Sequence, residues 1–431
     1  MLVQFSVKNF KTFKDKATLS LVASNYDKSD LELSNVFEVP NYLYRLLKSS
    51  VVFGANASGK TKFIDAIAFM RSFIINSSTG TQEGDEINVD SFKFNTESEN
   101  DTTEFEIIFI VNRSQFRYGF EITRKKVISE WLFQKRINLK PKEIELFFRD
   151  ELRIDFHSVF KKVEILDKEA DDIIRENALL LSIANQFKVK EAKEIVDFFK
   201  NMGFLLGNEP TRYEEFSLLE ISKKSNLGKK IIETLKRFDI GINDLNVNEV
   251  KLENDKRFSK EIISKLSLSN NKEITFFEAE AVHKQYDSNF NFVNNKNLDF
   301  DQESAGTQKL LAVLGPIFDS LLNGDLLFVD ELDSRLHPKI VSHLINLFNS
   351  RITNPKNAQL IFNTHNTNVL NENLFRRDQV WFTEKNRYGE AKLYSLANFK
   401  VRKDDNFEEK YLDGRYGGVP FLDDISNLFD K

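Results

Sequence analysis

The stretch VVFGANASGKT at residues 51–61 constrains the fold of this chain more than any other. It fits the phosphate-binding pattern G-x-x-x-x-G-K-[ST], with Gly54, Gly59, Lys60 and Thr61 at the fixed positions. A short apolar run precedes the loop, and apolar side chains recur at helical spacing after it. The sequence therefore predicts a buried strand, a glycine-rich loop and a helix, in that order. A chance match in a glycine- and serine-containing turn would not explain both the apolar run before the loop and the helical pattern after it.

The expected chemistry of this loop is the binding of a nucleotide's phosphates. Glycines let the backbone bend so that successive N–H groups point at phosphate oxygens, and the helix N-terminus adds a partial positive charge. Lys60 would reach the β- and γ-phosphates of ATP, and the Thr61 hydroxyl would bind Mg²⁺. The predicted nucleotide contacts in the loop are Gly54, Asn56, Ala57, Ser58, Gly59, Lys60 and Thr61.

A second buried strand is predicted in LLFVDELDSRLHP, residues 326–338, and it ends at Asp330 and Glu331. In P-loop enzymes an aspartate at this point holds the magnesium shell, so Asp330 would share the ion with Thr61. The adjacent Glu331 would orient and deprotonate the attacking water as a general base. The alternative is a strand that ends in acidic turn residues at the surface. The P-loop in the same chain favours the catalytic interpretation.

A third apolar strand, at residues 360–362, ends in Asn363-Thr364-His365. We expect this strand to lie beside the one that ends at Asp330, so that His365 reaches the rim of the sheet where α/β folds bind ligands. His365 is therefore predicted to contact the γ-phosphate. The alternative is a structural histidine in the loop.

The segment ESAGTQKLL, residues 303–311, has the pattern of a helix start. The Ser304 hydroxyl can accept hydrogen bonds from orphan backbone N–H groups, which is ordinary capping. A helix start with a small, flexible Gly306 is also suited to an anion. The motif Ser304–Gln308 contains no lysine or arginine, so alone it would bind ATP weakly.

The order of these motifs resembles that of the ABC-type ATPases, in the branch that contains RecF, SMC, OLD-type and anti-phage ATPases. Ser304 stands 27 residues before Glu331, where that family carries its signature motif. Asp333 matches the D-loop, and His365 matches the switch histidine. The opening VKNFKTF resembles the first strand of RecF-like proteins and adds Lys11 to the expected nucleotide contacts.

The resemblance implies that two subunits meet head to tail, each completing the other's ATP site. The residues that would act in trans are Ser304, Ala305, Gly306, Thr307, Gln308 and Asp333. Two departures from the family pattern concern γ-phosphate sensing. The signature reads Ser-Ala-Gly-Thr-Gln instead of Ser-Gly-Gly-Gln, and Gln82, in a polar turn, is the single weak candidate for a Q-loop glutamine.

The expected fold class is α/β: an ABC-ATPase head, a P-loop fold with a mixed sheet and an antiparallel β subdomain, carrying an inserted helical subdomain. We expect lobe I with the P-loop over residues 1–165 and a helical insertion over 166–265. Lobe II, with the signature motif, the Asp330 strand and the C-terminal tail, would cover 266–431. Paired basic residues in the insertion are interpreted as solvated helix faces, with a DNA or partner surface as the alternative. They are Lys223-Lys224, Lys229-Lys230, Lys236-Arg237 and Lys256-Arg257.

Composition excludes several classes of protein. A formal net charge of −5 gives no overall positive field for nucleic acid, and the lack of cysteine excludes disulfides and zinc–thiolate sites. The five histidines are scattered, which argues against a histidine-rich metal site. No apolar run approaches the roughly 18 residues that a membrane-spanning helix needs. We therefore expect a cytoplasmic protein with no membrane partner.

Three biological roles follow from the resemblance. The first is an ATPase that acts as sensor and scaffold of an anti-phage system and controls a separate effector from a neighbouring gene. The tail YLDGRYGGVP, residues 411–420, supports it because it resembles the tails of Septu, PARIS and abortive-infection ATPases. The second is a RecF-like clamp that grips DNA on ATP-driven dimerisation. The third, an OLD-like nuclease, needs a further metal domain, and 66 residues after His365 are too few.

Overall fold

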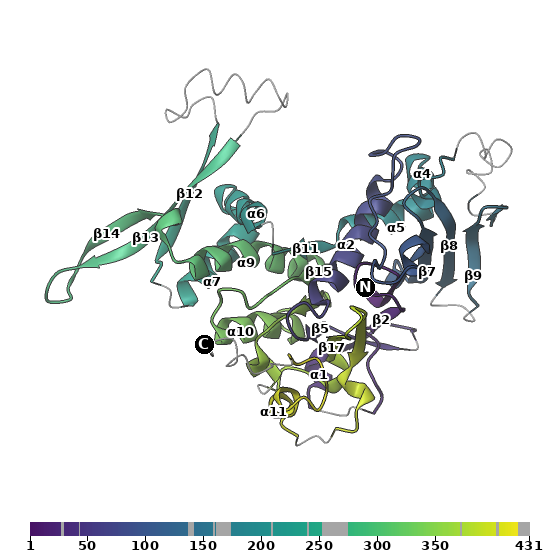
Figure 1. Cartoon of the computed structure of the whole chain (residues 1–431). Coiled ribbons are helices and arrows are strands. Elements are labelled where there is room, and N and C mark those ends of the chain that lie inside the picture. The colour runs from purple at the N-terminus through teal and green to yellow at the C-terminus, as the bar shows by residue number, and fades with distance from the viewer. Residues whose placement is uncertain are drawn as a thin grey trace, which may run out of the picture.

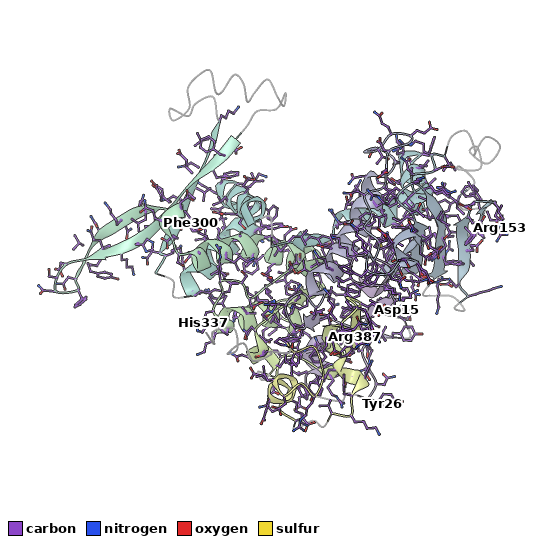
Figure 2. All side chains as sticks on the ribbon, viewed as in Figure 1. Asp15, Tyr26, Arg153, Phe300, His337 and Arg387 are labelled. Carbon is purple, nitrogen blue, oxygen red and sulfur yellow. The ribbon has the colours of Figure 1, made fainter. Side chains whose placement is uncertain are left out.

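The computed structural model describes residues 1–26, 30–42, 44–136, 142–157, 160, 174–207, 210–238, 241–251, 275–370, 373–401 and 405–420. Within these residues, two large sheets form the body of the molecule and a narrow β arm projects from it (Figure 1). Side chains are dense over the body and sparse along the arm beyond Phe300 at its base (Figure 2).

The first sheet is antiparallel throughout and has the strand order β10-β9-β8-β7-β6-β1-β2. The hairpin of β6 and β7 turns at Asn112 and Arg113, whose φ angles of 48° and 62° suit a tight two-residue turn. The alternating burial along β6 places one face on the core. Its strands are β1 Leu2–Lys8, β2 Ala17–Ser20, β6 Thr103–Val111, β7 Ser114–Ile122, β8 Val127–Arg136, β9 Ile144–Arg149 and β10 Ile154–Phe156.

The second sheet is mixed, with the order β11-β15-β16-β5-β17-β18. All its neighbouring pairs are parallel except β17 and β18. The strands β5, β15 and β16 are buried at every position, as expected for a parallel sheet covered on both faces. Its strands are β5 Ser49–Phe53, β11 Gly203–Leu205, β15 Leu326–Val329, β16 Gln359–Asn363, β17 Val380–Lys385 and β18 Ala391–Ser395.

This arrangement confirms the predicted fold class of a P-loop domain with a mixed sheet and an antiparallel β subdomain. The strand predicted to lie beside the Asp330 strand does so, because β16 pairs in parallel with β15. Helix α2, Lys60–Asn76, follows the P-loop and packs the apolar side chains that the sequence pattern indicated into the core shared with the antiparallel sheet. The buried apolar residues of α2 include Phe63, Ile64, Ile67, Met70 and Phe73.

The range 166–265 is not the purely helical insertion that we expected. Strand β11 lies inside it and is an edge strand of the mixed sheet, paired with β15. Helices α4 and α5 pack into the core of the antiparallel sheet, where Phe198 stacks on Phe109 with ring centroids 4.3 Å apart. The helices among the described residues of this range are α4 Leu180–Gln186, α5 Lys190–Lys200, α6 Pro210–Ser222 and α7 Asn226–Arg237. Residues 161–173 and 252–274, with Lys256-Arg257, lie outside the described residues.

The projecting arm is a three-stranded antiparallel sheet in the order β12-β13-β14. Its bounds are β12 Asp244–Lys251, β13 Thr275–Tyr286 and β14 Phe292–Asp299. The other elements include α1 Glu32–Asn35, β3 Val36–Glu38, β4 Arg45–Leu47, α9 Ala305–Asn323, α10 Pro338–Asn349 and α11 Phe407–Leu412. None of the helices among the described residues is both long enough and apolar enough to cross a membrane.

Candidate phosphate-binding site

The loop between β5 and α2 is shaped by backbone conformations that most residues avoid. Gly54 has φ 154°, and a Cβ there would lie 2.5 Å from both the Ser58 hydroxyl and the Thr383 carbonyl oxygen, so this position accepts only glycine. Ala57 also has a positive φ, of 60°. The Ser58 hydroxyl hydrogen-bonds with the Thr383 hydroxyl at 2.6 Å, so its side chain holds the loop to β17. Because the Ser58 hydroxyl is engaged in this way, only the backbone of Ser58 is available to contact a phosphate.

Lys60 lies at the start of α2 and is 6% exposed. Its ammonium donates to the carbonyl oxygens of Gly54 and Ala55, at 2.7 and 3.0 Å. Burial lowers the pKa of Lys60 to about 8, although Glu331 and Asp330 raise it. No carboxylate forms an ion pair with this ammonium among the described residues, so it can turn from the two carbonyl groups to an incoming anion.

The acidic end of β15 lies against the start of α2. The Thr61 hydroxyl donates to Asp330 at 2.9 Å, which joins two residues that are far apart in the sequence. Mg²⁺ is held in nucleotide sites by one or two carboxylates together with substrate phosphates, and this pair supplies a hydroxyl and a carboxylate of that kind. The donor set therefore fits the ion that the sequence predicted.

Asn363 organises this acidic pair, and sequence reasoning gave it no role. It is fully buried at the end of β16, donates its side-chain amide to Asp330 and accepts a hydrogen bond from the backbone N–H of Glu331 at 2.7 Å. Glu331 itself has φ 55°, a left-handed conformation that is uncommon outside glycine and that clusters at functional sites. The single amide thus fixes both carboxylate residues at the rim.

Asp333 and His365 meet on the same rim. The backbone N–H of His365 donates to the Asp333 carboxylate at 3.3 and 3.4 Å, and His365 is exposed. Asp333 therefore orders the loop after β16 within its own chain. The contact uses the backbone of His365 and leaves this residue exposed.

The signature motif forms the first turn of α9, as predicted. The Ser304 hydroxyl accepts a hydrogen bond from the Thr307 N–H at 3.1 Å, and the Gln308 side chain donates to the carbonyl oxygens of Asp301 and Glu303. A Cβ on Gly306 would lie 2.8 Å from the carbonyl oxygen of Arg335, so the helix start packs closely on the loop after Asp333. Ser304 and Ala305 are exposed.

A cation, Lys309, directly follows the motif, which itself has no lysine or arginine. Lys309 is the fifth residue of α9, just after the first turn, and is partly buried. Burial lowers the pKa of Lys309, and the nearby Glu331 opposes that effect. The motif itself holds no charge, but the helix end that presents it is positive through Lys309 as well as through its dipole.

Two predicted contacts take other partners. Lys11 forms an ion pair with Asp65 of α2 at 2.8 Å. The hydroxyl of the neighbouring Thr12 lies 3.1 Å from the position of a Cβ on Gly59, is buried and has no hydrogen-bond partner among the described residues. Gln82 lies in a turn where its backbone contacts Asp85 and Asn177.

The glycine-rich tail supports the P-loop. The Tyr411 hydroxyl donates to the Gly418 carbonyl oxygen at 3.0 Å, and a Cβ on Gly418 would lie 3.7 Å from the Cα of Gly54. The Tyr411 ring packs on Phe53, the last residue of β5. These contacts are structural and hold the tail against the phosphate loop.

The chain was compared with known proteins. Residues 49–371, more than half of the chain, match the family model described as "AAA domain, putative AbiEii toxin, Type IV TA system". The chain belongs to this family. It is an ABC-like P-loop ATPase by family, related to abortive-infection systems. No curated protein matches it.

Among solved structures, the chain is similar to an SMC head domain from Thermotoga maritima, with 13% identity and a TM-score of 0.39 over 93% of this chain and 99% of that one. An SMC head bound to the C-terminal winged-helix domain of ScpA gives 14% identity and a TM-score of 0.41, over 91% and 97% of the two chains. The recombination mediator protein RecF-ATP gives 12% identity and a TM-score of 0.32, also over 91% and 97%.

Proposed function

We propose that this chain binds and hydrolyses Mg-ATP at the rim formed by the P-loop, β15 and β16. The observation that carries the proposal is the hydrogen bond between Thr61 and Asp330, because it places a hydroxyl and a carboxylate together beside the phosphate loop. The P-loop N–H groups and Lys60 would hold the phosphates, and Thr61 and Asp330 would hold Mg²⁺. When bound, the ion would neutralise part of the negative charge on the phosphate oxygens.

The remaining residues act on the water and on the γ-phosphate. Glu331 would orient the attacking water and accept its proton, and Asn363 fixes the backbone from which that carboxylate projects. Lys60 would stabilise the negative charge that develops on the γ-phosphate, because a buried cation is strongest where water is excluded. His365 would contact the γ-phosphate from the rim.

We further propose that the site is completed by a second copy of the chain. The start of α9 is exposed at Ser304 and Ala305, so its first backbone N–H groups could meet the γ-phosphate held by a partner subunit. Lys309 would add positive charge to that contact. Asp333, which lies on the rim of its own chain's ATP site, would contribute to the same interface.

The biological role that we propose is a sensor and scaffold subunit of an anti-phage system that controls a separate effector protein. The relation of the family to abortive-infection systems supports it. A surface for such an effector is available at the end of the β arm, where large apolar side chains are exposed. They are Tyr286, Phe290, Phe292 and Val293, with exposed fractions of 52%, 87%, 57% and 57%.

The test of this role is the native mass of the Glu331→Gln protein, measured by light scattering with and without Mg-ATP, alone and co-expressed with its neighbouring gene. We expect an ATP-dependent dimer or larger assembly that carries a second polypeptide. Replacing Phe290 and Phe292 by Ser should release that polypeptide and leave dimerisation unchanged. An ATP-dependent dimer with no protein partner, and with salt-sensitive DNA binding, would instead support the RecF-like clamp.

Nucleotide affinity is expected to fall as the pH rises above about 8. The folded-state pKa of Lys60 without nucleotide is about 8, and bound phosphates raise it. Below about pH 8 the lysine is therefore already protonated before ATP binds, and the affinity for ATP has its full value. Above it the affinity should fall by up to about tenfold per pH unit, because the lysine must first regain its proton. Calorimetric titration of ATP between about pH 6.5 and pH 9.5 measures this. The Lys60→Arg variant, charged throughout, is the control; the same slope in both proteins would contradict the assignment.

A further inference from the structure

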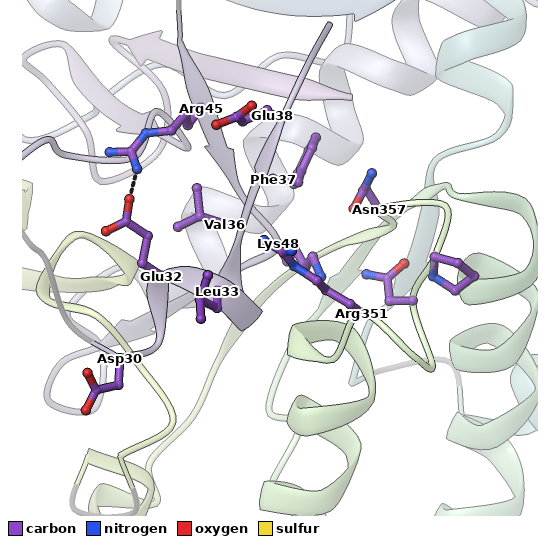
Figure 3. Close-up of a pocket in the computed structure, with 12 residues that line it drawn as sticks. Asp30, Glu32, Leu33, Val36, Phe37, Glu38, Arg45, Lys48, Arg351 and Asn357 are labelled. Atoms are coloured by element: carbon purple, nitrogen blue, oxygen red, sulfur yellow. Dashed lines mark hydrogen bonds and ion pairs between the residues drawn. The ribbon is translucent and has the colours of Figure 1, made fainter.

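A second cavity lies at the opposite end of the mixed sheet from the P-loop. The P-loop follows the carboxyl end of β5, whereas Lys48 immediately precedes the first residue of that strand. The cavity has a volume of about 940 Å³ and lies between α1, the β3–β4 hairpin and the loop after α10 (Figure 3). It is therefore separate from the proposed ATP site.

Lys48 is an unpaired cation in this cavity. It is fully buried, and its ammonium has no hydrogen-bond partner among the described residues. Burying an ammonium group without a partner is strongly unfavourable, so a lysine retained there indicates a missing counter-ion. Burial, together with Arg351, lowers the pKa of Lys48 to about 8.

Arg351 brings a second positive charge to the same place. The side chains of Lys48 and Arg351 meet in the middle of the cavity, as Figure 3 shows. In the part of the chain that the structure describes, the Arg351 guanidinium makes no ion pair with a carboxylate. Two adjacent cations without an anion between them repel each other, and a guanidinium is suited to bind two oxygens of one phosphate.

The carboxylates that line the cavity do not act as counter-ions to Lys48 and Arg351. Glu32 is paired with Arg45 on the opposite wall. Asp30 and Glu38 are exposed, and Figure 3 shows Asp30 at a distance from the two cations. The counter-ion must therefore come from outside the described residues.

Apolar side chains make up most of the rest of the wall, which indicates the kind of anion. Leu33, Val36, Phe37 and Pro355 line the cavity together with the polar Asn354 and Asn357. Cavities of about 300–1,000 Å³ with apolar walls and a few convergent polar groups are typical of small organic ligands. A bare inorganic ion would leave this apolar surface uncovered.

We propose that this cavity binds a small organic phosphate of mononucleotide size, with Lys48 and Arg351 holding the phosphate group. The apolar wall would cover the organic part of the ligand. The site is independent of ATP hydrolysis at the P-loop, so either proposal can fail without the other.

The test uses the Lys60→Ala protein, in which the P-loop does not compete for phosphates. Inorganic phosphate and AMP are the probes, measured by thermal shift and by calorimetric titration. We expect both probes to raise the melting temperature, and AMP to bind at least tenfold more tightly than phosphate. Adding Lys48→Met should raise the melting temperature without ligand, because it removes an unpaired buried charge, and should weaken AMP binding at least tenfold.

Two further variants keep the result interpretable. Arg351→Gln, at an exposed position, should also weaken AMP binding at least tenfold without affecting folding. Lys193→Met, which removes an exposed lysine on α5, should leave binding unchanged. No shift with either probe, equal affinity for phosphate and AMP, or full AMP binding by the Lys48→Met protein would each overturn the proposal.

Discussion

Replacing Glu331 by glutamine is expected to slow ATP hydrolysis by about 10²–10⁴-fold while Mg-ATP remains bound. Glutamine keeps the size of the side chain and its place beside Asn363, but its amide cannot accept the proton of the attacking water. The phosphate contacts of Lys60 and the Thr61–Asp330 pair are unchanged by this substitution. The affinity for ATP should therefore stay within about threefold of the unmodified protein.

The measurement is the rate of phosphate release under saturating ATP, with nucleotide affinity determined on the same preparation. The Glu83→Gln variant, in an exposed loop away from the site, should hydrolyse ATP at the normal rate. If Glu331→Gln also hydrolyses ATP at the normal rate, then Glu331 is not the base. A loss of ATP binding would instead indicate that the left-handed backbone at this position needs the glutamate for its structure.

The local part of the site could be predicted from the sequence. A P-loop is recognisable because its glycines, its lysine and the flanking strand and helix are contiguous in the chain. The same holds for the strand that ends at Asp330 and for the capped helix start at Ser304. Each depends on short-range spacing, which the sequence displays directly.

The contacts between segments could not be predicted in this way. Asn363 acquires its role because β16 pairs with β15, which brings its amide to Asp330 and Glu331. The tail at Gly418 supports Gly54 although more than 350 residues separate them. Such roles depend on register and packing, for which a single residue in a single sequence gives no pattern.

The range 166–265 shows a different limit of sequence patterns. Strand β11 has three residues, Gly203–Leu205, which is too short for a period of two to be distinguished from the end of a helix. Its assignment depends on pairing with β15 in the sheet. The preceding helices carry apolar faces that the pattern detected, but the pattern does not say that these faces pack against β6 and α2.

Replacing Ser304 by arginine is expected to lower the ATPase rate at least about 100-fold and to spare ATP binding, because in the proposed dimer Ser304 would serve the partner's site and not its own P-loop. An arginine at the exposed start of α9 would fill the space that the partner's γ-phosphate needs. The substitution also removes the cap on Thr307, which costs about 1 kcal/mol. The matched control is Ser225→Arg, which removes the equivalent cap of α7 and should leave the rate unchanged.

Mixing variants tests whether the site is shared between subunits. In a mixture of Ser304→Arg and Lys60→Ala proteins, half of the randomly formed dimers are mixed, and each mixed dimer has one intact P-loop opposite one intact α9 start. Two inactive proteins should therefore recover about a quarter of the normal rate when mixed in equal amounts. If Ser304 acted on the P-loop of its own chain, every subunit would still carry one defective half of its site. The mixture would then stay inactive, and the composite site would be rejected.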